Sequence, residues 1–382
     1  MKVNKIFLIG TTASNLYLFR KDFIISCIEQ GHQVFTLVSE YDDVWLDKIK
    51  SLGAEVITYG LSRSGLNPFK DLKTLLQLRE IIVEHQPDLV FSFFTKPVIY
   101  GSLAARLGKV PNVIGMIEGL GSPFTDHPTG QSLKMKLVQF FQVSLYRIVF
   151  PFIDKIIFLN DDDPKDLIIS KKIYHRKDAI HVLGGIGLKL EDYPYSPWDT
   201  SSNISFVIVA RLLIEKGIYE YLAAAKIVKE KYPNACFKIV GSLDTKNPSG
   251  LTQDELDNVI QSGVIEYKGF TNQIAEELKN SSVFVLPSYR EGVPRSTQEA
   301  MAIGRPIITT DVPGCRDTVI DSVNGFLTPK WDVNALANKM IYFIEHPEQI
   351  NIMGQESYKM AQEKFDAEKV NVKLLRIMGI CN

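Results

Sequence analysis

The stretch "SYREGVPRSTQEAMAIGRPIITTD", from Ser288 to Asp311, contains two glutamates, Glu291 and Glu299, eight residues apart. On one helix, at about 100° per residue, the two side chains would be about 80° out of phase. A shared helix is not expected, because Gly-Val-Pro lies between them. Proline suits the first turn of a helix, where its missing N–H is not needed. The stretch therefore predicts a loop that carries Glu291, followed by a helix over 295–303 that carries Glu299 and ends at Gly304.

Short apolar runs alternate with amphipathic segments on both sides of this stretch. In the C-terminal half the runs lie at 205–212, 235–243, 264–270, 282–288, 305–311 and 325–329. In the N-terminal half they lie at 5–10, 32–38, 54–60, 88–94, 112–119, 155–160 and 179–185. Such alternation is typical of parallel sheets with helices on both faces. Residues 191–202, rich in Pro, Ser and Asp, interrupt the pattern and predict a linker between two domains.

The composition excludes several classes of protein. A chain of 382 residues favours two domains, and a net charge of -1 provides no global attraction to nucleic acid or to an acidic bilayer. Four cysteines lie far apart without metal-ligand spacing, which fits a reducing cytosol. The apolar run 5–10 is too short for a signal peptide, and no run of 18 or more residues predicts a membrane span. Gly-Thr-Thr-Ala-Ser-Asn follows the first predicted strand instead of G-x-G-x-x-G, which argues against a dehydrogenase.

The residues after run 282–288 have the chemistry of a ligand site, since parallel sheets bind ligands beyond the carboxyl ends of their strands. The N–H groups of Arg295, Ser296 and Thr297 would point out of the helix and attract an anion. Glu299 could accept hydrogen bonds from both hydroxyls of a sugar diol. The structural alternative, in which Glu291 caps the helix and Glu299 is solvated, stays open on the motif alone.

A second element, "ARLLIEKG", follows the first strand of the C-terminal half. Arg211 and Lys216 would neutralise a diphosphate, Arg211 through its planar fork and Lys216 as a point charge. Such cations stabilise a departing nucleoside diphosphate more in the transition state than in the ground state. By itself this element is also compatible with a solvated turn. Together the elements predict a nucleoside diphosphate-sugar site, with the ribose at Glu299 and the sugar at Glu291.

The motifs "ARLLIEKGI", "PSYREGVPRSTQEAMAIGRPIITTDVPGCRDTV" and "VNGFLTP" resemble those of the family 4 retaining glycosyltransferases, and the likeness covers nearly the whole chain. The resemblance implies the GT-B fold, which is α/β with two Rossmann-like parallel-sheet domains facing a central cleft. It implies an N-terminal acceptor-binding domain over 1–190 plus 358–382, because the C-terminal helix crosses back. The linker is 191–202, and the donor-binding domain is 203–357.

The resemblance also implies roles for individual residues, with Arg211, Lys216 and Glu291 as the catalytic set. In the family's pattern Arg211 and Lys216 bind the diphosphate, and Ser296 and Thr297 contact its phosphates. Glu291 binds the donor sugar together with the amides of Gly292, Val293 and Pro294. Glu299 binds the ribose, and the backbone at Gly269 and Phe270 lies against the base. The implied donor is a UDP-activated hexose or N-acetylhexosamine, and no metal or other cofactor is implied.

Within the family, the N-terminal half resembles enzymes that act on polyprenyl diphosphate-linked sugars in bacterial surface polysaccharide or glycan assembly. The stretches that carry this likeness are "LSRSGLNPFKDL", "FSFFTKPVIYGSLAARLG" and "GMIEGLGSPF". The implied acceptor is a lipid-linked sugar or an oligosaccharide, and the acceptor-side candidates are Thr12, Lys96 and Glu118. Many members carry a histidine near the loop after their fifth strand, where this chain has Glu118, which serves polar positioning or caps a turn. "GGIGLKLEDY" (184–193) stands where relatives often have Asn-Gly-Val-Asp, so the resemblance assigns it no acceptor or hinge role.

Two further segments have alternative interpretations. "NDDDP", 160–164, resembles the metal-binding D-x-D of another glycosyltransferase fold, but an aspartate before proline also makes a good helix start, and we favour this cap over a metal site. Residues 133–158 combine basic residues with a strongly apolar run. They predict either a helix in a membrane interface or a buried helix with its lysines at the rim. The first interpretation would place the protein peripherally on the inner face of the cytoplasmic membrane.

The sequence thus predicts a cytoplasmic, retaining, UDP-sugar-dependent hexosyltransferase. Two other classes remain as alternatives. A UDP-sugar 2-epimerase would need its own acid and base carboxylates. A non-enzymatic sugar-nucleotide-binding protein would keep Glu299 and bind UDP without turnover.

Overall fold

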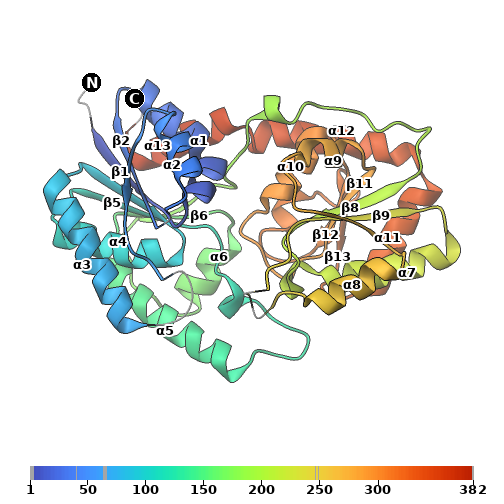
Figure 1. Cartoon of the computed structure of the whole chain (residues 1–382), viewed down its shortest axis with the longest axis horizontal. Helices are drawn as coiled ribbons and strands as arrows, with labels where there is room; N and C mark the ends of the chain where they lie inside the picture. Colours follow the sequence, from blue (N-terminus) through green and yellow to red (C-terminus); the bar gives the residue numbers. More distant parts are fainter. Residues whose placement is uncertain (1–3, 40, 63–66, 246, 248, 381–382) are drawn as a thin grey trace. The chain divides into compact units, whose positions relative to one another are not determined.

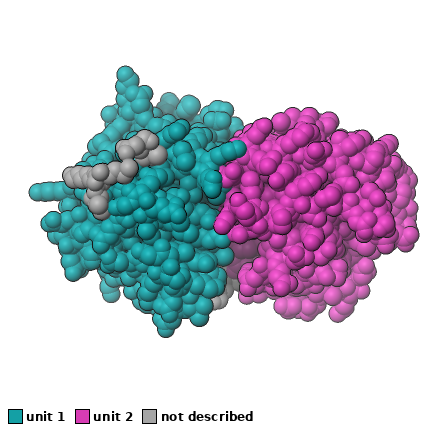
Figure 2. All heavy atoms as spheres, turned by 90° about the horizontal axis from the view of Figure 1, so that it is seen from above, with its two compact units in different colours: residues 1–123, 132–186, 367–382 teal, residues 124–131, 187–366 magenta. Residues whose placement is uncertain are grey.

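The chain divides into two compact units in the computed structural model, which describes residues 4–39, 41–62, 67–245, 247 and 249–380 (Figure 2). Unit 1 comprises residues 1–123, 132–186 and 367–382, and unit 2 comprises residues 124–131 and 187–366. Each unit contains one parallel sheet. The prediction of two parallel-sheet α/β domains is therefore confirmed.

Unit 1 is built on a seven-stranded sheet in the order β3-β2-β1-β4-β5-β6-β7, with every neighbouring pair parallel. Figure 1 shows this sheet with β1, β2, β5 and β6 labelled. The strands are β1 (Lys5–Ile9), β2 (Gln33–Val38), β3 (Glu55–Thr58), β4 (Leu89–Phe93), β5 (Asn112–Ile117), β6 (Lys155–Phe158) and β7 (Ile180–Val182). The helices are α1 (Ala13–Glu29), α2 (Asp43–Lys50), α3 (Pro68–His85), α4 (Thr95–Leu107), α5 (Leu133–Val149), α6 (Asp162–Pro164) and α13 (Ala367–Met378). The central strands are nearly continuous apolar runs because both faces of a parallel sheet are buried.

Unit 2 is built on a six-stranded parallel sheet in the order β10-β9-β8-β11-β12-β13. The strands are β8 (Ser205–Val209), β9 (Cys236–Val240), β10 (Glu266–Gly269), β11 (Val283–Leu286), β12 (Ile307–Thr310) and β13 (Gly325–Thr328). The helices are α7 (Ile218–Lys231), α8 (Gln253–Gln261), α9 (Ile274–Lys279), α10 (Arg295–Ile303), α11 (Val333–Glu345) and α12 (Glu348–Lys364). The helix predicted over 295–303 is α10, and it ends where Gly304 adopts a φ of 88°.

The division between the units differs from the boundaries expected from the sequence. Residues 191–202 belong to unit 2, where Asn351 Oδ1 accepts from the Trp198 N–H at 2.8 Å and Arg305 donates to the Ser196 carbonyl. The helical period over 357–379 conceals a break between α12 and α13, and only the part from Ala367 onward belongs to unit 1. Residues 124–131 also belong to unit 2, which the sequence did not indicate.

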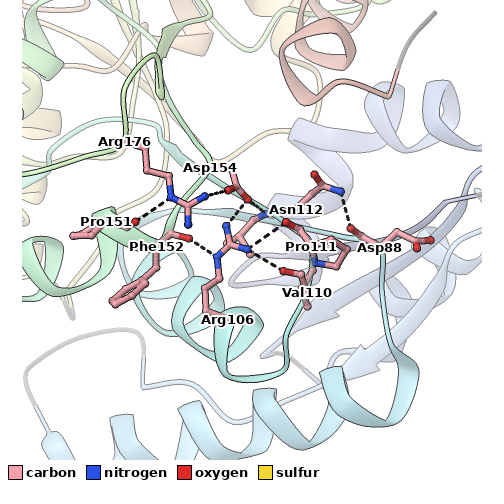
Figure 3. Close-up of polar contacts among 10 residues, drawn as sticks. Asp88, Arg106, Val110, Pro111, Asn112, Pro151, Phe152, Asp154 and Arg176 are labelled. Atoms are coloured by element: carbon pink, nitrogen blue, oxygen red, sulfur yellow. Dashed lines mark hydrogen bonds and ion pairs between the residues drawn. The ribbon is translucent and has the colours of Figure 1, made fainter.

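A polar network fixes the amino edge of the unit 1 sheet (Figure 3). Asp154, which precedes β6, accepts from both Arg106 and Arg176 and, at 2.8 Å, from the Val113 N–H. Arg106 Nε also donates to the Phe152 carbonyl at 2.5 Å. The chain that follows α5 is thus tied to α4 at the edge opposite to the one expected to bind ligands.

Candidate functional site

The sheet of unit 2 reverses its strand order between β8 and β11. From β8 the chain proceeds outward to β9 and β10, and from β11 it proceeds to β12 and β13 on the other side. Ligands of open parallel sheets bind beyond the carboxyl ends of the strands at such a switch point. Arg211 and Lys216 follow β8, and Glu291 follows β11. The three predicted catalytic residues therefore follow the two strands that flank the switch point.

Lys216 and Glu291 form an ion pair at this point. The distance from Lys216 Nζ to Glu291 Oε1 is 2.5 Å, and Ser288 Oγ donates to the same oxygen at 2.7 Å. Only 22% of the Lys216 side chain and 11% of the Glu291 side chain are exposed. The sequence identified the two charged groups but gave no sign that they pair, nor that Ser288 supports them.

Arg211, in contrast, points into solvent. Its side chain is 59% exposed, and Nη1 lies 3.3 Å from Oδ2 of Asp244, which the sequence did not identify. A long exposed pair of this kind contributes little to stability. Arg211 is therefore free to exchange Asp244 for an anionic ligand.

Two glycines permit the close approach of the loops at this edge. Gly217, which precedes α7, has a φ of 74°, and a Cβ there would lie 2.1 Å from the Pro287 carbonyl oxygen. Gly314 has a φ of 79°, and a Cβ there would lie 2.3 Å from the Glu291 carbonyl oxygen. Any larger residue would push the β8 and β12 connections away from the segment that carries Glu291.

The N-terminus of α10 provides fewer groups than the sequence implied. Pro294, the N-cap residue, has no N–H and so cannot donate to a donor sugar, which corrects its inclusion among the amides. Thr297 is fully buried, and its hydroxyl has no hydrogen-bond partner among the described residues, so its contact with a phosphate stays a prediction. Ser296 is half-buried, and its role as a phosphate contact stays a prediction. Gly292 and Val293 stay predictions as backbone donors.

Glu299 lies one turn into α10 and is not solvated, so the alternative of a free surface carboxylate is wrong. Its side chain is 12% exposed, and its Oε1 accepts from Tyr193 Oη at 2.9 Å and from Arg295 Nε at 3.1 Å. Burial raises the pKa of the Glu299 carboxyl, while Arg295 and the Tyr193 hydroxyl lower it. Tyr193 and Arg295 were not identified as site residues from the sequence.

The predicted base-binding residues lie at the outer end of the same edge. Gly269 closes β10 with a φ of 69°, and its carbonyl accepts from the Gly241 N–H at 2.8 Å. The Phe270 side chain is 72% exposed, which leaves a ring face available for stacking.

The acceptor-side candidates follow the three central strands of unit 1. Thr12 follows β1, Lys96 follows β4 and Glu118 follows β5, and the strand order reverses between β1 and β4. All three are engaged in the fold. Thr12 Oγ1 caps α1 by accepting from the Asn15 N–H at 3.0 Å, and Lys96 Nζ lies 2.9 Å from Oδ1 of Asp71.

Glu118 pairs with Arg20, whose side chain is only 4% exposed. Arg20 also lies against the Phe93 ring, with its guanidinium carbon 5.1 Å from the ring centroid. Burial raises the pKa of Glu118, and Arg20 opposes that rise. The sequence alternatives of polar positioning and turn capping did not include this buried ion pair.

The D-x-D-like segment begins a helix, but not in the way predicted. Asn160 Oδ1 accepts from the N–H groups of Asp162 and Asp163 at 3.1 and 2.8 Å, so Asn160 provides the cap in place of an aspartate. Among the residues that the structure describes, no group of three or more His, Cys, Asp or Glu side chains is arranged to hold a metal ion.

The basic, apolar segment 133–158 is not one helix. Helix α5 ends at Val149, and residues 155–158 form the buried strand β6. On α5, one stripe of large apolar side chains faces solvent at Leu133, Leu137, Phe140, Phe141 and Ile148. Helix α5 therefore buries one face, at Gln142, Val143, Tyr146 and Val149, and leaves the apolar stripe of the opposite face exposed. No helix within the described part of the chain is long and apolar enough to cross a membrane.

Two family models match this chain. The model described as "Glycosyl transferases group 1" matches residues 197–360, and the model described as "Glycosyl transferase 4-like" matches residues 5–160. The first model lies within residues 187–366, which form most of unit 2. The second lies within residues 1–186, which form most of unit 1.

Curated relatives match over most of their length. The chain is 30% identical over 344 residues to the N,N'-diacetylbacillosaminyl-diphospho-undecaprenol alpha-1,3-N-acetylgalactosaminyltransferase of Campylobacter jejuni, covering 87% of each protein. It is 28% identical to the UDP-Gal:alpha-D-GlcNAc-diphosphoundecaprenol alpha-1,3-galactosyltransferase of Escherichia coli, covering 75% of this chain and 73% of that protein.

Solved structures share the fold. The crystal structure of Anabaena HepE in complex with UDP-glucose matches with a TM-score of 0.76 at 18% identity, covering 98% of this chain and 99% of that chain. At this identity the likeness concerns the fold alone.

Proposed function

Because this chain belongs to the group 1, family 4-like glycosyltransferases and has the GT-B fold, we propose that it moves a hexose or N-acetylhexosamine from a UDP-sugar to a polyprenyl diphosphate-linked acceptor. That it is a glycosyltransferase follows from the family. The choice of donor, acceptor and retained anomeric configuration is the proposal. The single observation that carries the donor part is the set of charged groups at the β8–β11 switch point of unit 2, headed by the Lys216–Glu291 pair.

The donor would lie along the carboxyl edge of unit 2. The uracil would face Phe270, the ribose Glu299, and the diphosphate the N-terminus of α10 together with Arg211. Glu291 would hold the hydroxyls of the sugar. We also propose that no metal is required, since Arg211 and Lys216 provide the positive charge that a metal supplies in other transferases.

The acceptor part of the proposal is supported by the relatives. Both named transferases act on sugars linked to a diphospho-undecaprenol, and the likeness to the Campylobacter protein covers 87% of this chain. The same names favour transfer over epimerisation or ligand sensing. Acceptor recognition would involve the carboxyl edge of unit 1, where Lys96 and Glu118 lie.

The donor assignment predicts that UDP stabilises the protein and that the effect depends on Glu299. At 100 times its dissociation constant, UDP should add about 2.7 kcal/mol to the free energy of unfolding. Thermal unfolding with UDP, GDP, ADP and NAD, on the wild type and on Glu299→Ala, measures this. Of the four nucleotides, only UDP should raise the unfolding midpoint of the wild type. UDP should not raise the unfolding midpoint of Glu299→Ala.

The same titration tests each part of the assignment. A rise with NAD, or no rise with any nucleotide, contradicts the donor site. A rise with UDP that survives in Glu299→Ala places the ribose elsewhere. Repeating the titration with a chelator and with added Mg²⁺ tests the metal-free part, which fails if stabilisation requires the metal.

Helix α5 is proposed to lie on the membrane that carries the lipid-linked acceptor. Its exposed stripe includes Phe140 and Phe141, which are 61% and 43% exposed, and the flanking Lys134 and Lys136 are exposed as well. An apolar face bordered by lysines suits an anionic membrane interface. This arrangement would place the protein peripherally on the cytoplasmic face.

Membrane contact predicts that Phe140→Ser/Phe141→Ser weakens binding to anionic vesicles at least tenfold in a flotation assay, because two aromatic rings no longer enter the interface. Ile169→Ser is the matched control, since Ile169 is 71% exposed in the same unit but lies outside α5. Equal binding of the double variant and the wild type would contradict the assignment.

A further inference from the structure

The Glu299 carboxylate is anchored through one oxygen only. Tyr193 Oη and Arg295 Nε both donate to Oε1, at 2.9 and 3.1 Å. From the residues that the structure describes, Oε2 receives no hydrogen bond, and the side chain retains 12% exposure. One oxygen is thus fixed by the protein, and the other is left for a ligand.

The two anchors reach Glu299 from different segments. Arg295 is the first residue of α10 and stands one helical turn before Glu299. Tyr193 comes from the segment in which the chain enters unit 2 at Gly187. Arg295 Nη1 donates to the Gly187 carbonyl at 2.5 Å, so the two anchors are themselves tied to one short stretch of chain.

That stretch is in turn fixed where the chain leaves the unit. The Leu188 N–H donates to the Phe365 carbonyl at 2.8 Å, and Leu188 forms a parallel bridge with Asp366. The position of Tyr193 is therefore determined by backbone pairing at both chain crossings of unit 2.

A glutamate held in this way is a better acceptor than a free one. An unanchored Glu side chain loses rotamer freedom when it binds a ligand, and this loss opposes binding. Hydrogen bonds from a phenol and a guanidinium to a carboxylate are charge-assisted and hold its plane. With that plane fixed, Oε2 has a defined direction in which to accept from a sugar hydroxyl.

We propose that Tyr193, acting with Arg295, is a positioning residue for ribose recognition: it holds Oε1 of Glu299 so that Oε2 accepts from the ribose diol of the donor nucleotide. This inference rests on the proposed function, which places the ribose at Glu299. It assigns a role in donor binding to the 184–193 segment, to which the sequence resemblance gave none.

The test compares two ligands that differ only in the diol. Dissociation constants for UDP and 2′,3′-dideoxy-UDP are measured by calorimetry on the wild type, Tyr193→Phe and Glu299→Ala. Tyr193→Phe keeps the ring and removes the hydroxyl. The variant should bind UDP roughly tenfold more weakly, which is the effect of losing one hydrogen bond to a charged group. The dissociation constant for dideoxy-UDP should stay nearly unchanged. In turnover the same variant should raise the KM for the donor while kcat stays near that of the wild type.

Tyr195→Phe is the matched control. Tyr195 lies two residues further along the same segment, and its ring packs at a tilt against that of Tyr358, with centroids 4.7 Å apart. It should bind both ligands like the wild type. Unfolding midpoints without nucleotide show whether each variant is folded.

The outcomes separate the inference from the proposed function. If Glu299→Ala no longer binds UDP but Tyr193→Phe binds it like the wild type, the positioning role is overturned and the donor site stands. If Tyr193→Phe binds UDP and dideoxy-UDP more weakly by the same factor, Tyr193 has a structural role only. If it binds UDP more tightly than the wild type, Tyr193 competes with the ribose. Either result overturns the inference. If the folded wild type binds no UDP, the donor assignment itself fails.

Discussion

Replacing Lys216 with alanine is expected to lower kcat for sugar transfer roughly 10²- to 10³-fold, the usual effect of removing one fixed group that stabilises developing charge. The physical reason lies in the position of the ammonium group. Lys216 is 22% exposed, follows the strand on one side of the switch point, and meets Glu291 from the strand on the other. In the proposed transfer the departing UDP gains negative charge as the glycosidic bond breaks, so a cation there would favour the transition state over the bound donor.

The structure also allows a second cause for a loss of activity in Lys216→Ala, and the experiment must distinguish the two causes. Lys216→Ala leaves Glu291 mostly buried without its cation, and loss of activity could then reflect a displaced carboxylate. Lys216→Met/Glu291→Gln removes both charges and relieves that problem. Glu291 belongs to the proposed catalytic set as well, so the comparison is with Glu291→Gln alone, which keeps Lys216. If Lys216 acts on the leaving group, the double variant should be at least tenfold slower than Glu291→Gln although its unfolding midpoint recovers.

The measurement is steady-state UDP release with a polyprenyl diphosphate-linked acceptor, together with unfolding midpoints. Lys226→Ala, an exposed lysine on α7 with the same change of charge, should behave like the wild type. A double variant as active as Glu291→Gln, or a Lys216→Ala variant within threefold of the wild-type kcat, would show that Lys216 does not act on the leaving group.

The two sheets and helix α10 could be predicted because their signals are local. Apolar runs separated by helical periods indicate parallel strands, and Gly-Arg-Pro ends α10 where the structure ends it. The donor-site candidates were found for the same reason, since Glu291 and Glu299 lie in one continuous motif.

The partners of these residues could not be predicted, because they are distant in sequence. Tyr193 precedes Glu299 by 106 residues, and Arg20 precedes Glu118 by 98 residues. No period or spacing relates residues so far apart. Only the return of the chain to the same sheet edge brings them together.

The unit boundaries were misplaced for a related reason. Pro- and Ser-rich composition indicates an irregular backbone, but not whether tertiary contacts hold it, and residues 191–202 are held by Asn351 and Arg305. Likewise, the helical period continues through Phe365 and Asp366. The break there coincides with their pairing to Leu188, a tertiary contact that overrides local propensity.

In unit 1, Arg20→Ala is expected to lower the free energy of unfolding by about 3–5 kcal/mol at neutral pH, because it leaves a buried carboxylate without its partner. Arg20 and Glu118 are 4% and 13% exposed, so solvent replaces little of the lost interaction. Urea unfolding measures the change. Arg20→Met/Glu118→Gln removes both charges and should recover most of the stability.

The loss should also depend on pH in a defined direction. Burial already raises the pKa of Glu118 above its ordinary value of 4.5, and Arg20 opposes that rise, so removing Arg20 raises the pKa further. A carboxyl whose folded pKa lies above its unfolded pKa is tolerated when protonated and destabilises the fold as pH rises through the folded value. The Arg20→Ala defect should therefore be smaller at mildly acidic than at mildly alkaline pH. A defect that does not change with pH would mean that lost packing against Phe93 dominates.

The same double variant decides whether Glu118 has a role in the reaction. Its fold and its UDP binding should be intact, because the proposed donor groups lie in unit 2. If Glu118 contacts the acceptor from the carboxyl edge of the unit 1 sheet, the KM for the acceptor should rise while the KM for the donor does not. An unchanged acceptor KM in a folded double variant would make the Arg20–Glu118 pair a feature of the fold alone.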